Sequence, residues 1–473
     1  MKVLAIDQGT TGTKGFSLDA DGNFTKIASY EHKQIYPQAG WVEHDAEELL
    51  GQISKTIKKA GRVDAIGIAN QGETLVAWDR ETGKPVYNAI VWQDDRTKGM
   101  TEDLKARGAE SLTQAKAGLP LDPYFSASKF RWILDHVPEA RILLSAGRLR
   151  LGTSDSYFLD RLTGTFATDV TTASRTSLMS LDALQWDEEL CALFGVPMEC
   201  LPEIRATNGH FGTIGKAQVT ANLVDQQAAL FGHGCMMPGD AKITFGTGAF
   251  ALALVGHARP QQNEQGLLPT VAWQMAGQPP LFAMDGGVYN AASAVNWAKG
   301  LGLFSDYAEI NAFGAQSALA RGIVFVPALS GLACPHWDRA ASGLWLGLGL
   351  DTTKQDMMQA VLEGVALRAQ EVVRAIDRLA GKGNFISIDG GLSSNPYFGQ
   401  FLANALNRQV SVAGSADLTA LGTARMAMLG AGARTLPPLP APKHSFEPRE
   451  PVSAKLLSRF DIAVIRSKGW KNF

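Results

Sequence analysis

Three glycine-rich turns are the parts of this sequence whose residue types could bind phosphate. One spans residues 7–15 (DQGTTGTKG), one residues 246–248 (GTG) and one residues 389–391 (DGG), and each follows an apolar run. Backbone N–H groups of such turns can converge on phosphate oxygens because glycine has no Cβ to block the approach, and Thr and Lys side chains add donors and charge. Any one turn alone is weak support for phosphate binding, since a glycine-containing hairpin usually binds nothing.

The spacing of these turns favours a duplicated architecture. Gly9 and Gly246 lie 237 positions apart in a chain of 473 residues, almost half its length. Similarity at this period favours two related lobes over a short-period solenoid. Neither a Walker P-loop nor a Gly-x-Gly-x-x-Gly fingerprint occurs in a suitable context. The sequence therefore favours a nucleotide held between two lobes.

Strand and helix patterns alternate around the turns, which favours an α/β fold. The first turn is predicted to be the tip of a hairpin, and helical spacing over 46–59 precedes a short buried strand at 65–69. Residues 121–201 are richer in helix signals and should cover a sheet or form an inserted lobe. Further helices are predicted over 126–136, 155–162, 396–406 and 454–467, and the Pro-rich stretch 436–451 is predicted to be a surface strap.

Composition excludes several classes of protein. Forty-four Lys and Arg against 46 Asp and Glu leave a net charge of -2, which argues against nucleic acid or an anionic membrane as the main partner and favours a small soluble ligand. No apolar run reaches the roughly 18 residues of a membrane span, and Asp7 interrupts the start too early for a signal peptide, so we expect a cytoplasmic protein. The four cysteines form no Cys-x-x-Cys pair and should be buried free thiols.

Six segments resemble those of glycerol kinases in the FGGY carbohydrate kinase family. They are residues 7–11 (DQGTT), 40–45 (GWVEHD), 82–93 (TGKPVYNAIVWQ), 122–126 (DPYFS), 225–232 (DQQAALFG) and 419–422 (TALG). The resemblance runs in order from residue 2 to about residue 432. It implies an actin-like, duplicated ribonuclease-H-like fold, with an N-terminal lobe over 1–234, a C-terminal lobe over 235–473 and ATP in the cleft between them. It also implies transfer of the ATP γ-phosphoryl group to a hydroxyl of a polyol or sugar.

The resemblance assigns a role to two carboxylates. It implies that Asp225 is the general base that accepts the hydroxyl proton, whereas an Asp before Gln-Gln at a helix start is by itself more often an N-cap. From that helix position we expect a lowered pKa for Asp225. It also implies that Asp7 and Asp225 are the two carboxylates of a Mg²⁺ site. The alternative for Asp7 is a structural role in closing a turn.

Nucleotide contacts follow from the same resemblance. It implies phosphate contacts from Thr10, Thr11 and Lys14, the last of which stands where glycerol kinases usually carry Arg. It implies that Gly246 and Thr247 form the opposing phosphate turn and that Gly390, Gly391 and Asn395 belong to the adenosine-binding segment. Ala292 and Asn296 align by position with a family Gly and Gln near the nucleotide.

The acceptor site departs from glycerol kinases at two positions. The matching residues are Glu73, Trp92, Tyr124, Asp225, Gln226 and Phe250. Gly72 replaces an Arg, which removes up to five N–H donors and one charge and opens volume. Asp94 resembles the ketopentose kinases, although Asp94 and Asp95 could equally be a solvated loop pair. The acceptor is therefore left open among glycerol, a longer polyol such as erythritol, and a ketose such as xylulose or ribulose.

Two further expectations concern the class and regulation of the protein. An actin-like ATP-dependent sensor without a phosphoryl acceptor is the alternative from a different class, and the joint match of three aromatic residues with Asp225 favours the kinase. Residues 206–223 lack the loop associated with fructose bisphosphate inhibition, so we expect none; loss of activity on adding fructose 1,6-bisphosphate would contradict this. The oligomeric state is not readable from the sequence, with a homodimer as one option.

Overall fold

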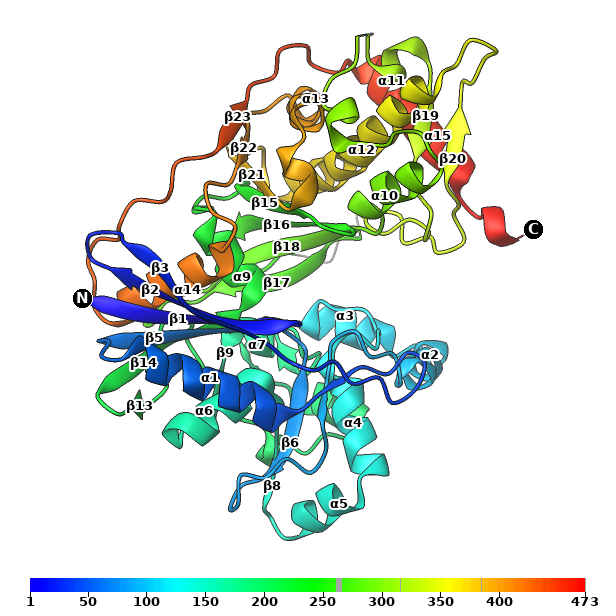
Figure 1. Cartoon of the computed structure of the whole chain (residues 1–473). Helices are drawn as coiled ribbons and strands as arrows, with labels where there is room; N and C mark the ends of the chain where they lie inside the picture. The colour runs from blue at the N-terminus through cyan, green and yellow to red at the C-terminus, as the bar shows by residue number, and fades with distance from the viewer. Residues whose placement is uncertain (261–265, 315, 384, 473) are drawn as a thin grey trace.

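Two large sheets stacked one above the other organise the chain, with a smaller sheet beyond the lower one (Figure 1). The computed structural model describes residues 1–260, 266–314, 316–383 and 385–472. Residues 261–265, 315, 384 and 473 of the predicted C-terminal lobe thus lie outside the described residues. No helix among those described is long and apolar enough to cross a membrane. All four cysteines are buried, as predicted.

The lower sheet carries the first glycine turn. Its strands are, in spatial order, β13 (Thr213–Ile214), β14 (Ala217–Val224), β5 (Ala65–Asn70), β1 (Lys2–Gln8), β2 (Gly12–Asp19) and β3 (Phe24–Glu31). The pairs β1–β5 and β5–β14 are parallel, whereas β1 and β2 form the predicted antiparallel hairpin, in which Asp7 faces Lys14. The carboxyl ends of β1, β5 and β14 therefore meet at one edge of this sheet.

The upper sheet repeats this plan. Its strands are β17 (Leu268–Trp273), β18 (Leu281–Val288), β16 (Ala249–Gly256), β15 (Ala241–Phe245), β21 (Ile386–Asp389), β22 (Val410–Val412) and β23 (His444–Phe446). The antiparallel hairpin β15–β16 carries the second glycine turn, and β21, parallel to β15, ends at the third. The predicted strap over 436–451 runs along one side of the molecule in Figure 1 and contributes β23 to the sheet edge.

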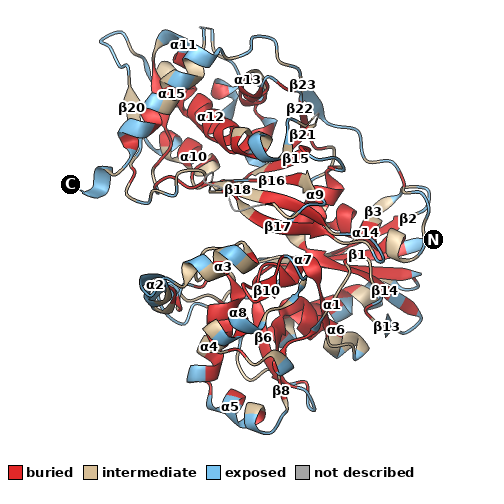
Figure 2. Cartoon of the chain, turned by 180° about the vertical axis from the view of Figure 1, so that it is seen from behind, coloured by how far each residue is buried: buried red, intermediate tan, exposed pale blue. Residues whose placement is uncertain are grey.

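The helices cover these sheets and bury their apolar faces (Figure 2). In the N-terminal half they are α1 (Ala46–Ala60), α2 (Lys98–Ala106), α3 (Glu110–Ala117), α4 (Ser126–His136), α5 (Pro138–Ser145), α6 (Ser154–Thr163), α7 (Val170–Ala173), α8 (Glu188–Phe194) and α9 (Asp225–Gly232). In the C-terminal half they are α10 (Ala292–Gly300), α11 (Ala318–Arg321), α12 (Lys354–Ala380), α13 (Pro396–Leu406), α14 (Leu418–Gly430) and α15 (Ala454–Ser467). Single 3₁₀ turns occupy Met198–Cys200, Tyr307–Ile310, Gly391–Ser394 and Trp470–Asn472.

Helices within residues 121–201 cover a smaller sheet, one of the two arrangements expected. This four-stranded sheet has the order β4 (Glu43–His44), β7 (Ala89–Ile90), β6 (Leu75–Asp79) and β8 (Leu149–Thr153), and α4 packs against β6. Three short strand pairs complete the described chain: β10 (Met179–Ser180) with β11 (Gln185–Trp186), β9 (Ala167–Asp169) with β12 (Glu203–Arg205), and β19 (Val324–Val326) with β20 (Leu344–Leu346).

Helices α9 and α14 lie between the two large sheets. Helix α14 comes from the C-terminal half of the chain, yet it packs against β1, β2, β5 and β14 of the lower sheet as well as against α9. One apolar cluster accordingly joins Val3 and Ala221 with Leu421 and with Leu252 of the upper sheet. The division of the chain at residue 234 stays a prediction. The packing of α14 shows that a helix from the C-terminal half covers the sheet of the N-terminal half.

Candidate active site

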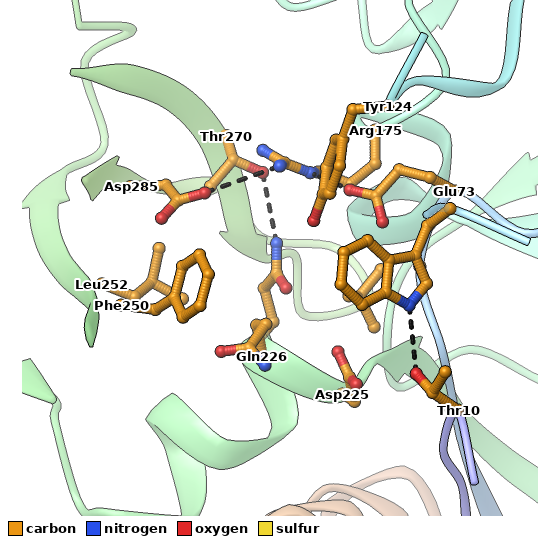
Figure 3. Close-up of a pocket in the computed structure, with 14 residues that line it drawn as sticks. Thr10, Glu73, Tyr124, Arg175, Asp225, Gln226, Phe250, Leu252, Thr270 and Asp285 are labelled. Carbon is orange, nitrogen blue, oxygen red and sulfur yellow. Dashed lines mark hydrogen bonds and ion pairs between the residues drawn. The ribbon is translucent and has the colours of Figure 1, made fainter. Parts of the chain in front are cut away.

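A cavity of about 200 Å³ lies between the two large sheets (Figure 3). Its lining residues are Thr10, Gly72, Glu73, Trp92, Tyr124, Arg175, Val224, Asp225, Gln226, Gln227, Phe250, Leu252, Thr270 and Asp285. Thr10, Gly72 and Asp225 follow the carboxyl ends of β1, β5 and β14, the edge at which open α/β sheets bind ligands. Phe250 and Asp285 come from β16 and β18 of the opposite sheet, so both sheets contribute to one site.

Asp225 is the first residue of α9, directly after β14. Burial, followed by the nearby Asp7 carboxylate, raises the pKa of Asp225 to about 7. The expected lowering of this pKa is therefore wrong, because loss of solvation and a like charge outweigh the favourable field of the helix start. Burial also raises the pKa of Asp7 to about 6, against the opposing effect of Lys14.

An aromatic wall closes the side of the cavity next to Asp225. The Trp92 indole N–H donates to the Thr10 hydroxyl at 3.0 Å, and the Trp92 and Tyr124 rings meet edge to face with centroids 5.5 Å apart. Lys129 is fully buried behind them, and its Nζ donates to the carbonyl oxygens of Trp92 at 3.2 Å and Tyr124 at 3.1 Å. On the opposite side Phe250 is 52% exposed and lines the cavity, so its ring is accessible to a ligand.

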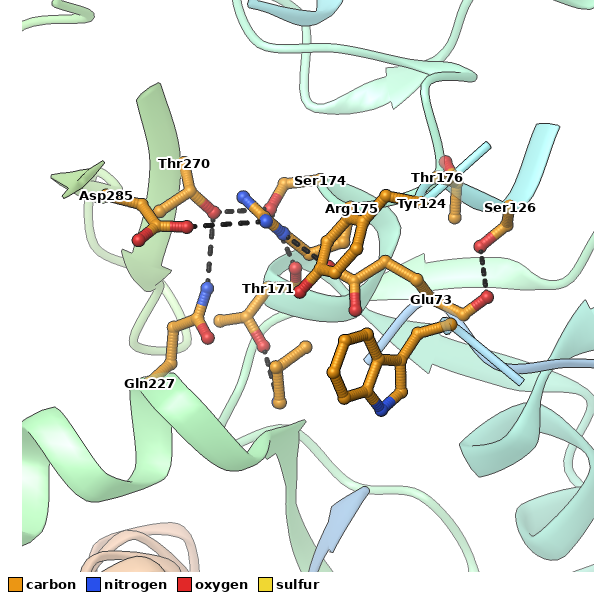
Figure 4. Close-up of polar contacts among 12 residues, drawn as sticks. Glu73, Tyr124, Ser126, Thr171, Ser174, Arg175, Thr176, Gln227, Thr270 and Asp285 are labelled. Atoms are coloured by element: carbon orange, nitrogen blue, oxygen red, sulfur yellow. Dashed lines mark hydrogen bonds and ion pairs between the residues drawn. The ribbon is translucent and has the colours of Figure 1, made fainter. Parts of the chain in front are cut away.

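A chain of charges, buried at Glu73 and Arg175 and half-buried at Asp285, lines the cavity (Figure 4). Arg175 Nε donates to Glu73 Oε1 at 2.7 Å, and Arg175 Nη2 lies 3.5 Å from Asp285 Oδ2. Glu73 has a φ of 59°, in the left-handed region that non-glycine residues seldom adopt, and Ser126 holds its carbonyl oxygen at 2.9 Å. Strained backbone of this kind is common at functional sites, and here it fixes the direction of one carboxylate.

Sequence reasoning missed Arg175, Thr270, Gln227 and Asp285. Only Asp285 left a local signal, since it interrupts the buried run Leu281–Val288 with a charge. The Thr270 hydroxyl bonds Ser174 at 3.0 Å and accepts from Gln227 Nε2 at 3.2 Å, so these residues join α7, α9 and β17. Their part in the site arises from tertiary contacts between distant segments.

Asp94 lies outside this cavity. Its carboxylate is buried and forms a bidentate pair with Arg96, with Oδ1 2.8 Å from Nε and Oδ2 2.7 Å from Nη2. The same carboxylate accepts from the Val42 backbone N–H, and the Arg96 guanidinium lies 3.8 Å from the centre of the Trp41 ring. Asp94 thus orders the segment that carries Trp92, and its predicted contact with the acceptor stays a prediction.

The first glycine turn is built for close approach. A Cβ at Gly12 would lie 2.5 Å from the carbonyl oxygen of Tyr30, whereas at Gly9 it would meet no atom closer than 3.7 Å. The side chains of His32 and Gln34 lie 2.8 and 2.9 Å from the Thr10 carbonyl oxygen and fix the turn. Thr11, a predicted phosphate contact, is the next residue of this turn. Lys14 is paired with Asp417 across the lobes, with Nζ 3.1 Å from Oδ1.

The second and third turns lie together on the upper sheet. The backbone N–H groups of Ala291 and Ala292 donate to the Thr247 and Gly246 carbonyl oxygens at 2.9 and 3.0 Å, which joins the start of α10 to this turn. A Cβ at Gly390 would lie 2.3 Å from the Phe245 carbonyl oxygen, whereas one at Gly391 would meet no atom within 4 Å.

Two predicted nucleotide contacts have other partners in this structure. The Asn395 side chain caps α13 and donates to the Ile310 carbonyl oxygen at 2.8 Å, and Asn296 on α10 accepts from the Tyr307 hydroxyl at 2.8 Å. Their nucleotide contacts stay predictions.

The donor set is compatible with a hard cation that keeps most of its water. In the part of the chain that the structure describes, no three His, Cys, Asp or Glu side chains are grouped to hold a metal ion. The Asp7 carboxylate nevertheless lies close enough to Asp225 to raise the pKa of Asp225. Mg²⁺ commonly binds through one or two carboxylates and several waters, so the two residues fit this ion.

A carboxylate facing a polar, aromatic-walled cavity, between two sheets that each bear a glycine turn, is the arrangement of a two-domain kinase that acts on a small hydroxyl compound. The chain belongs to the FGGY family of carbohydrate kinases: the model of the family's N-terminal domain matches residues 2–232 and that of its C-terminal domain residues 241–431. The predicted family and the actin-like, ribonuclease-H-like fold are thereby confirmed.

Full-length relatives agree with this assignment. The chain is 41% identical over 490 residues to a glycerol kinase of Thermus brockianus, with 99% of each chain covered. It is 42% identical over 450 residues to a glycerol kinase of Nocardia farcinica (strain IFM 10152), covering 91% of this chain and 90% of that one. Glycerol kinase from Plasmodium falciparum with ADP is a similar solved structure, with TM-score 0.91, 30% identity and 98% of each chain covered. A xyloylose kinase from Brucella ovis shares the fold, with TM-score 0.85, 24% identity and 99% and 98% of the two chains covered.

Proposed function

We propose that this carbohydrate kinase transfers the γ-phosphoryl group of Mg-ATP to a hydroxyl of glycerol or a related small polyol or sugar. The observation that carries the proposal is the position of Asp225, at the floor of a cavity whose other polar groups suit hydroxyls. Its neighbours Gln226 and Glu73 bring further oxygen and nitrogen atoms to the same space. The 41% identity to a glycerol kinase supports glycerol-like acceptors.

Asp225 acts as the base that takes the proton from the acceptor hydroxyl. Phosphoryl transfer passes through a loose transition state, so the protein mainly positions the hydroxyl and accepts its proton. A carboxylate with a pKa near neutrality accepts a proton more readily than an ordinary Asp, and burial gives Asp225 such a pKa. Trp92, Tyr124 and Phe250 shape the apolar sides of the site and exclude water.

The two phosphate turns hold the nucleotide from opposite sides. Thr10, Thr11 and Lys14 contribute hydroxyl and ammonium donors from the lower sheet, and Gly246 and Thr247 form the facing turn. Asp7 and Asp225 would hold Mg²⁺, which would supply charge neutralisation at the phosphates. Gly390, Gly391, Asn395, Ala292 and Asn296 border the adenosine end.

An ATP-binding sensor without acceptor chemistry is the less well supported function. A sensor needs the nucleotide turns alone and has no use for a carboxylate beside a second polar cavity. The cavity at Asp225 is lined by residues from both sheets and is separate from the turn at Gly390. The structure therefore favours the kinase.

Substitution of the base tests the proposal. Asp225→Asn should lower kcat by about 10³-fold or more with ATP and glycerol or another accepted polyol, while the Kd for ADP measured by calorimetry changes by less than about three-fold. Asp45→Asn is the matched control, because Asp45 caps α1 and Asn caps helices equally well. Turnover retained by Asp225→Asn would rule out Asp225 as the base, and the absence of any phosphorylated polyol with the wild type would overturn the proposed function.

A further inference from the structure

A second cavity adjoins the acceptor cavity and shares one wall with it. It measures about 260 Å³, and Trp92, Tyr124, Arg175, Phe250 and Asp285 line both cavities. The shared residues include both members of the Arg175–Asp285 pair, so charged groups stand where the two spaces meet. A ligand that extends away from Asp225 in this direction enters the second cavity.

Arg175 retains hydrogen-bonding capacity at this junction. The residue is only 5% exposed, its Nε is used by Glu73 and its Nη2 faces Asp285, but its Nη1 has no hydrogen-bond partner in the structure. A buried donor without a partner costs about 1–3 kcal/mol, which a ligand hydroxyl would recover. Position 72 carries no side chain, so among the described residues that line the acceptor cavity only Arg175 supplies a guanidinium.

The far part of the second cavity has the chemistry of a polyol site. Phe125, Tyr289 and Trp337 contribute aromatic rings, against which the C–H faces of a carbon chain can pack. Asp122 and Arg339 line both this cavity and a neighbouring one and so stand at its rim, where one offers an acceptor and the other donors. The Arg339 guanidinium lies 5.7 Å from the centre of the Tyr289 ring. Hydroxyl groups need both kinds of partner, which the rim supplies.

We propose that the physiological acceptor is a polyol or ketose of at least four carbons that spans both cavities. Its reacting hydroxyl lies at Asp225, its middle passes Arg175, and its distal hydroxyls reach the rim formed by Asp122 and Arg339. The proposal rests on the proposed kinase activity and adds the class of acceptor to it. Glycerol fills only the first cavity and leaves the second to water.

The test compares acceptors rather than absolute rates. In an ATP-coupled assay with glycerol, erythritol and xylulose, the wild type should use one of the longer acceptors with a kcat/KM at least about ten-fold above that for glycerol. Gly287 lines only the second cavity, and a Cβ there would make ordinary contact with the Phe250 ring at 3.6 Å. Gly287→Leu should therefore fill the second cavity and reduce the ratio of the two kcat/KM values by about ten-fold.

A second variant and a control keep the test decisive. Arg339 is exposed, so Arg339→Ala should fold and should lower the same ratio about three- to ten-fold through a higher KM for the longer acceptor. Gly51→Leu in α1, where no atom lies within 4 Å of a Cβ, should leave the ratio at its wild-type value. A wild type that phosphorylates glycerol but neither longer acceptor, or a ratio unchanged in both cavity variants, overturns the inference while the proposed function stands. Failure with all three acceptors would instead count against the proposed function.

Discussion

Gly72 and Val224 share one space at the floor of the acceptor cavity. A Cβ at position 72 would lie 3.1 Å from Val224 Cγ1, so any side chain there must displace the valine. Val224 therefore occupies part of the space that an Arg side chain at position 72 would need. Introducing Arg at position 72 without changing Val224 would add a hydrogen-bond donor but also a steric clash.

A paired substitution at this spot should improve the use of glycerol. Gly72→Arg together with Val224→Gly gives the guanidinium room, and a charged hydrogen bond of about 1.5–3 kcal/mol predicts roughly a ten- to hundred-fold gain in kcat/KM for glycerol. Gly72→Arg alone should gain much less because Val224 remains. Steady-state kinetics of the double variant, both single variants and the wild type measure this. A double variant no better than wild type would show that the pocket is defined elsewhere.

Lys129 gives the fold a pH dependence above neutrality. Burial lowers the pKa of Lys129 from 10.5 to about 8. Between these values the unfolded chain holds the proton and the folded chain has released it, so the lysine's contribution to stability rises with pH across this window and is lost as pH falls through about 8. The full effect corresponds to about 3 kcal/mol.

Denaturant unfolding at pH 8 and pH 10 measures this effect. The free energy of unfolding of the wild type should rise over this interval relative to that of Lys129→Met, which has no titrating group at the position. Lys98→Met removes a lysine whose side chain is 65% exposed and should track the wild type. If the free energy of unfolding changes equally for the wild type and Lys129→Met between pH 8 and pH 10, this lysine stays charged.

The residues that the sequence revealed are those that belong to local motifs. Thr10, Trp92, Tyr124, Asp225 and Phe250 each lie in a run whose order carries information, and all five line the cavity. Arg175 and Thr270 could not be found in this way, because their partners lie on other segments of the chain. The pKa of Asp225 was predicted in the wrong direction for the same reason, since burial and Asp7 are invisible along the sequence.

At the scale of elements, α9 and α14 meet backbone to backbone. A Cβ at Gly422 would lie 1.8 Å from the Ala228 carbonyl oxygen, and one at Gly232 would lie 2.1 Å from that of Leu418. Glycines in the segments 225–232 and 419–422 therefore allow the two helices to approach this closely. Because α9 begins at Asp225, this contact also positions the base.

A single methyl group should disturb this contact. Gly422→Ala is expected to lower the free energy of unfolding by about 1–3 kcal/mol and to lower kcat, since α9 must shift to relieve the clash. Gly51→Ala makes the same change inside α1, where the Cβ has free space, and should stabilise the protein by up to about 1 kcal/mol. Denaturant midpoints and kcat for the three proteins test the pair; a neutral Gly422→Ala would contradict the packing.

Elements with strong end signals could be predicted to the residue. The helices over 396–406 and 454–467 match α13 and α15, because Asn395 and Ser453 cap them and Pro396 opens the first. The strands β4 and β7 have two residues each, too few to show a period, and their sheet forms only through distant pairing. The helices over this sheet could therefore be predicted from the sequence, but the sheet itself could not be located.

At the scale of the whole molecule, we expect the two lobes to close over the site. Phosphoryl transfer to a hydroxyl rather than to water needs a closed site, and the Phe250 ring is still half exposed. A non-hydrolysable ATP analogue and an acceptor added together should lower the radius of gyration measured by X-ray scattering. Acceptor alone should change it less, because it does not bridge the glycine turns of the two sheets. An unchanged radius with both ligands would mean that the lobes are already closed.

Helix α14 has a consequence for how the chain is made. The strands of the lower sheet are translated before the upper lobe, but the helix that covers Val3, Ala5 and Ala221 begins only at Leu418. Until then α9 alone covers part of this apolar face, and exposed sheet faces are prone to association. The nascent chain must keep that face from aggregating while the upper lobe is translated, so the core beneath the lower sheet is completed only after most of the upper lobe has been made.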